Sequence, residues 1–81
     1  MPNLQFERDQ LILADRHVAL ARRNIADLRT NVAKSRAAGD ETALVERALA
    51  AAEDGLGAFL EHRGLIVQTI DDIEAGRLPS S

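Results

Sequence analysis

Apolar residues recur at seven-residue intervals along nearly the whole chain, and one short segment interrupts them. The interruption is residues 37–42, where Gly39 suits the left-handed position just past a helix end and Asp40 suits the N-cap of a following helix. So short a connection can only turn the chain back on itself. The sequence therefore predicts an all-α fold, an antiparallel two-helix hairpin of the coiled-coil type.

The expected helices cover residues 4–38 and 41–75, with a turn at 39–40 and a tail over 76–81, all in one unit of residues 1–81. Both prolines, Pro2 and Pro79, fall outside these ranges, where they do not interrupt helix hydrogen bonds. Asp40 is expected to cap the second helix, and Gly76 to end it.

The heptad pattern also predicts which residues form the seam between the helices. In the first helix the large seam residues are Leu4, Leu11, Val18, Ile25 and Val32, and most residues of the alternating position are small. In the second helix the two seam positions hold Val45, Leu49, Ala52, Leu56, Phe59, Arg63, Ile66, Ile70 and Ile73. Large residues then face small ones in most layers, and Val18 is expected to meet Phe59.

Charge differs between the two halves of the chain. Residues 1–38 hold seven basic and four acidic side chains, and residues 39–81 hold three and nine. A basic helix beside an acidic one predicts ion pairs along one edge. The expected pairs join Arg8 to Glu74, Arg22 and Arg29 to Glu53, and Arg29 and Arg36 to Glu46.

Nucleic-acid binding is disfavoured, because the net charge is −3 and no aromatic platform for bases is present. It is kept as an alternative in which a small regulator uses the arginines of the first helix: Arg16, Arg22, Arg23, Arg29 and Arg36.

A polar layer interrupts the seam. His17 is expected beside His62, and Arg63 occupies a seam position opposite Ala14. The first interpretation is a hydrogen-bonded layer that fixes the register of the helices. One alternative is a pH-sensitive contact. Another is a metal- or ligand-binding helical bundle that uses His17, His62 and Arg63, in which a dimer would supply four imidazoles to Zn²⁺ or another borderline metal.

Signatures of catalysis are missing from the sequence. It has no Cys, no glycine-rich phosphate loop and no His-Glu-x-x-His. The Glu-x-x-His pattern of di-iron bundles is also absent, because Ala14 precedes His17 and Phe59 precedes His62 by three residues. We therefore expect a non-enzymatic structural or protein-interaction module without a cofactor.

Two helices alone bury little apolar surface, and without disulfides the remaining common means of stabilisation is oligomerisation. Apolar and small residues outside the seam, mostly away from the turn, predict a surface for a homodimer that forms a four-helix bundle, or for another helical protein. The predicted interface residues are Phe6, Ile12, Leu13, Leu20, Gly57, Leu60, Gly64, Leu65 and Val67.

The N-terminal residues lack the basic and apolar regions of a signal peptide, and no apolar run is long enough to span a membrane. Together with the absence of Cys, this favours a cytoplasmic protein without a membrane partner.

Three stretches carry a resemblance to a known group: residues 14–19 (Ala-Asp-Arg-His-Val-Ala), residues 39–43 (Gly-Asp-Glu-Thr-Ala) and residues 61–63 (Glu-His-Arg). With them the chain resembles short helical-hairpin proteins of alphaproteobacteria over residues 10–73. The resemblance implies a bacterial origin and a small helical protein, and it brings no activity, ligand or catalytic residue with it.

Overall fold

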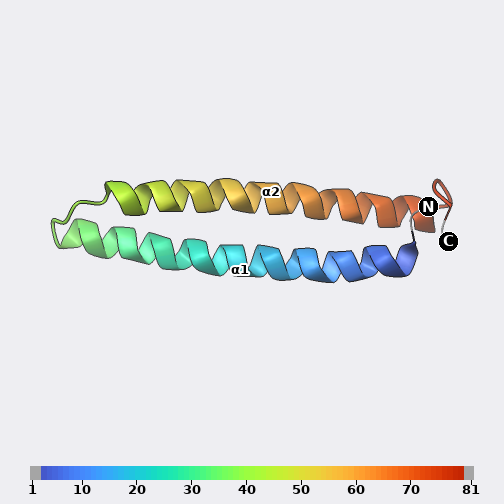
Figure 1. Cartoon of the computed structure of the whole chain (residues 1–81), viewed down its shortest axis with the longest axis horizontal. Helices are drawn as coiled ribbons and strands as arrows, with labels where there is room; N and C mark the ends of the chain where they lie inside the picture. Colours follow the sequence, from blue (N-terminus) through green and yellow to red (C-terminus); the bar gives the residue numbers. More distant parts are fainter. Residues whose placement is uncertain (1–2, 80–81) are drawn as a thin grey trace.

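The computed structural model describes residues 3–79, which form two helices, α1 (Leu4–Ala37) and α2 (Ala43–Glu74). The helices run antiparallel and side by side, so the start of α1 and the end of α2 share one end of a rod (Figure 1). The expected all-α hairpin is confirmed. The structure does not describe Met1 and Pro2, which precede the first expected helix, or Ser80 and Ser81 of the expected tail.

The helix ends follow from local sequence. Asn3 caps α1, because its Oδ1 accepts a hydrogen bond from the Phe6 N–H at 3.0 Å. Gly39 and Gly76 follow the two helices with φ of 75° and 78°. Each glycine stands in a Schellman motif, in which the N–H of the following residue donates a hydrogen bond to a carbonyl of the last helical turn. Asp40 N–H donates to the Ser35 carbonyl at 2.9 Å, and Arg77 N–H donates to the Asp72 carbonyl at 2.7 Å.

The start of the second helix differs from the expectation. α2 begins at Ala43 and its N-cap position is Thr42, so the assignment of Asp40 as the cap was wrong. The reason is the Schellman bond, which ties the backbone of Asp40 to the last turn of α1. The chain then needs residues 40–42 to cross to the axis of α2, and the turn is longer than the two residues expected.

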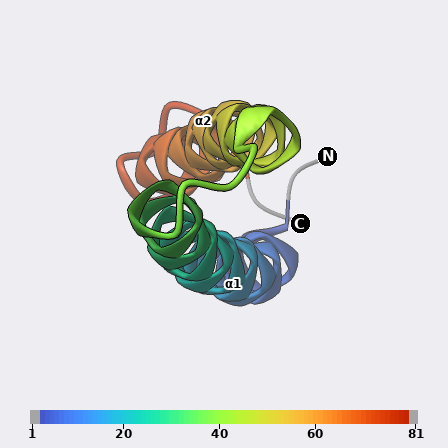
Figure 2. The same ribbon diagram turned by 90° about the vertical axis from the view of Figure 1, so that its left-hand side faces the viewer.

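The seam holds every buried side chain of the described residues. These side chains are 3–9% exposed, and all occupy predicted heptad positions: Ala14, Ile25, Val32, Ile66, Ile70 and Ile73. Leu4 and Leu11 pack against the cluster of Ala14, Ile66 and Ile70. The helices wind around each other as in a coiled coil (Figure 2). Phe59 was also predicted to lie in the seam, but its side chain is 38% exposed.

The resulting rod exposes more surface than a compact chain. Its dimensions are 58 × 15 × 15 Å and its radius of gyration is 18.0 Å, against about 12 Å for a globular chain of this length. Its accessible surface is 5655 Å², whereas a globular monomer of 8.8 kDa exposes about 4,800 Å². Neither helix within residues 3–79 combines the length and apolarity needed to cross a membrane.

Candidate functional site

The seam separates two long faces of the hairpin, and one of them is lined by ion pairs. Arg8 contacts Glu74 at 3.1 Å, Arg29 contacts Glu53 at 3.7 Å, and Arg36 contacts Glu46. All three pairs join positions that the heptad pattern predicted to face each other. We call this side the ion-pair face; its members are Arg8, Asp15, Arg22, Arg29 and Arg36 of α1 and Glu46, Glu53, Leu60, Val67 and Glu74 of α2.

The hydrogen bond from Arg36 holds the pKa of Glu46 below its ordinary value, and a hydrogen bond from Thr42 acts in the same direction. The pairs are exposed to solvent, where such contacts add little stability. Their main effect is to fix which residues of α1 lie beside which residues of α2.

The opposite side is almost free of charge. At 100° per residue, the helix positions that point away from the ion pairs hold uncharged side chains over most of the hairpin. We call this side the neutral face; its members are Phe6, Gln10, Leu13, His17, Leu20 and Asn24 of α1 and Leu44, Ala48, Ala51, Gly55, Ala58, His62, Leu65 and Thr69 of α2. On α1 the same positions continue toward the turn as Asp27, Asn31 and Lys34, and on α2 they continue away from the turn to Asp72.

Large apolar side chains stand in solvent on the neutral face. Their exposed fractions run from 43% to 76%, for Leu13, Phe6, Leu20, Leu65 and Leu44 in rising order. Leu44 is the most exposed of them, and the predicted interface omitted it. The sequence could have indicated Leu44, because it lies three heptads before Leu65 and so on the same line along the helix.

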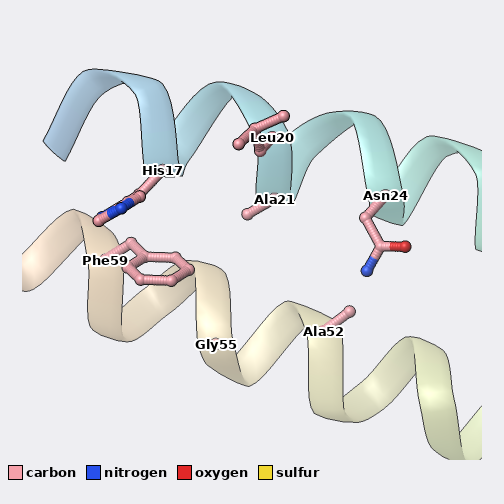
Figure 3. Close-up of a pocket in the computed structure, with 7 residues that line it drawn as sticks. All are labelled: His17, Leu20, Ala21, Asn24, Ala52, Gly55 and Phe59. Carbon is pink, nitrogen blue, oxygen red and sulfur yellow. The ribbon is translucent and has the colours of Figure 1, made fainter. Parts of the chain in front are cut away.

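A groove of ≈ 370 Å³ opens on the neutral face near the middle of the rod. Its lining comes from both helices: His17, Leu20, Ala21 and Asn24 of α1 and Ala52, Gly55 and Phe59 of α2 (Figure 3). The rings of His17 and Phe59 lie together with centroids 5.3 Å apart. Most of the lining is apolar, so the groove is suited to receive an apolar side chain from a packing helix.

The polar seam layer is arranged differently from the expectation. Arg63 donates from Nε to Oδ1 of Asp15, on the ion-pair face. The ring of His17 lies against that of Phe59 at a tilt of 37°, and no hydrogen bond joins His17 to His62 in the part of the chain that the structure describes. Across residues 3–79, no group of three or more His, Asp or Glu side chains is placed to hold a metal ion.

The nine predicted interface residues do not share one face. Four of them belong to the neutral face: Phe6, Leu13, Leu20 and Leu65. Helix geometry turns the other five toward the ion-pair side: Ile12, Gly57, Leu60, Gly64 and Val67. Val67 is half-buried inside the hairpin. A Cβ built on Gly57 or Gly64 meets nothing within 4 Å, so the packing of this chain does not require glycine there.

The arginines considered for nucleic acid are partly occupied, since Arg29 and Arg36 bind glutamates of α2. Comparison with family models, curated proteins and solved structures gives no match to this chain. The resemblance to alphaproteobacterial hairpins therefore stays a prediction, and function has to be argued from the two faces.

Proposed function

We propose that this hairpin is a non-enzymatic structural and protein-interaction module that binds a second copy of itself through the neutral face, forming a four-helix bundle. The observation that carries the proposal is the contrast between the faces. Large apolar side chains are exposed on a side that holds few charges, and ion pairs join the two helices on the other side. An apolar stripe of this extent is typical of a surface that another protein covers.

The area available matches what a dimer needs. The chain exposes about 900 Å² more than a globular monomer of its mass, by the size scaling of folded proteins. A stable interface buries about 800 Å² per partner. A face 58 Å long and 15 Å wide has a projected area of about 870 Å², so it is large enough to supply that area.

Adjacent residues on opposite faces allow a matched test. Leu13 on the neutral face and Ile12 on the other side are 43% and 53% exposed, and both lie on α1. We expect Leu13→Glu to weaken self-association at least tenfold, because the carboxylate loses its water in the interface. Ile12→Glu should leave it unchanged. Sedimentation velocity over a range of concentrations measures both.

Equal weakening by the two variants would place the contact elsewhere on the rod. An unmodified protein that stays monomeric would assign the neutral face to a different helical protein, and self-association would be rejected.

A further inference from the structure

The groove on the neutral face is open because several of its lining residues are small. Gly55 contributes no side chain to the lining, and Ala21 and Ala52 contribute only methyl groups (Figure 3). A Cβ built on Gly55 meets nothing within 4 Å, so the hairpin has room for a side chain there. Glycine inside a helix also lowers its stability relative to alanine. Packing within one chain therefore does not account for glycine at this position, whereas a surface that approaches from outside would.

The groove lies at the middle of the rod. The midpoint of α1 falls between residues 20 and 21, and that of α2 falls between residues 58 and 59. The lining residues span 17–24 on α1 and 52–59 on α2, so they include both midpoints.

This location decides what the groove faces in the proposed self-association, on which the inference rests. Two copies that stack their neutral faces over the whole rod are related by a two-fold axis along the rod or across its middle. An axis along the rod leaves every level unchanged, and an axis across the middle exchanges the ends but returns the middle to itself. In both cases the groove of one copy faces the groove of the other.

The chemistry of the groove suits such a contact. Its seven lining residues include no Asp, Glu, Lys or Arg. An uncharged side chain of the second copy can therefore enter without covering a charge in the lining, which would be unfavourable. Residues near the centre of an interface also contribute most to its affinity, because the surrounding contacts exclude water from them.

We infer that Gly55 is the point of closest approach between the two copies. The second hairpin packs into the groove over the bare backbone of Gly55, and a side chain at position 55 would occupy the space that this contact needs. The inference holds for either direction of the second copy, because the middle of the rod faces itself in both.

Gly57 provides a matched control in the same helix. It lies two residues after Gly55, which turns it by about 200° around the helix axis and away from the neutral face. A Cβ on Gly57 likewise meets nothing within 4 Å. The same substitution at the two positions thus differs in the face that receives the methyl group.

Gly55→Ala should weaken self-association about fivefold or more, because the added methyl group overpacks the contact. Gly57→Ala should leave self-association unchanged. Sedimentation velocity over a range of concentrations measures both dissociation constants. Circular dichroism should show unchanged helix content in each variant, because alanine favours helix more than glycine does, so a weaker dimer would not result from a lost fold.

A dissociation constant of Gly55→Ala equal to that of the unmodified dimer would overturn the close approach at Gly55 and leave self-association standing. A tighter dimer would overturn it too, since the groove would then have space to spare, and so would equal weakening by Gly57→Ala. An unmodified protein that stays monomeric would overturn both the inference and the proposed function.

Discussion

At the scale of single residues, the ion pairs fix how the two helices align. The exposed pair of Arg36 and Glu46 lies next to the turn, and that of Arg8 and Glu74 lies at the far end. Each exposed pair stabilises the fold only slightly. Because the pairs stand at both ends and between them, a shift of one helix by a turn would break all of them at once.

The Arg36–Glu46 pair predicts a specific dependence on pH. The pKa of Glu46 is lowered in the folded chain, so the pair stabilises the fold above the ordinary glutamate pKa and this contribution is lost as the pH falls through the folded value. Arg36→Gln should raise the pKa of Glu46 toward the ordinary value. An NMR titration of the glutamate side-chain carboxyl carbons measures it.

Arg22→Gln is the matched control, since Arg22 occupies the same heptad position of α1 and makes no ion pair among residues 3–79. Arg22→Gln should leave the pKa of Glu46 unchanged. If both variants shift Glu46 equally, the general charge of α1, and not the pair, sets its pKa.

At the scale of the elements, the glycines have opposite roles. Gly39 ends α1 with a φ of 75°, which side chains other than glycine adopt at a cost. Gly57 lies inside α2, in open space, where glycine only lowers helix stability. One residue type thus terminates one helix and weakens the other.

Alanine substitutions should separate these roles. Gly39→Ala should destabilise the fold by about 1–2 kcal/mol, because the left-handed conformation becomes strained. Gly57→Ala should stabilise it by about 1 kcal/mol, because alanine favours helix and its Cβ meets no neighbour. Urea unfolding at equal protein concentration measures both. A loss of stability with Gly57→Ala would indicate that another helix packs closely on that residue.

The sequence predicted the elements well because helices and seams follow from periodicity. The helix over Leu4–Ala37, the three ion pairs and the buried positions such as Ile25 and Ile66 all follow from heptad spacing. The start of α2 did not follow, because the preference of Asp40 for an N-cap does not reveal how many residues the turn needs.

The candidate site was predicted less completely. A heptad assigns a residue to a line along the helix, but not the direction in which its side chain leans. Phe59 was therefore placed in the seam, whereas its ring lies at the edge of the neutral face against His17. The predicted interface also joined residues such as Ile12 and Leu13, which are neighbours in sequence but point to different faces.

At the scale of the whole molecule, the hairpin is a rod with a thin core. The described residues bury six side chains, and the main cluster of Ala14, Ile66 and Ile70 lies nearer the end opposite the turn. The large exposed side chains of α1 on the neutral face, Phe6, Leu13 and Leu20, stand over the same half. A second copy bound to this face would therefore bury these side chains next to the main cluster and enlarge the core there.

The most direct test of the central claim is the solution mass of the unmodified protein, measured by light scattering from high to low micromolar concentration. Self-association through the neutral face predicts a mass of about twice the 8.8 kDa of one chain, which falls toward that of the monomer only on dilution. A mass of one chain at every concentration would contradict it, because the exposed apolar side chains of Leu13, Leu20 and Leu65 would then have no partner in a second copy.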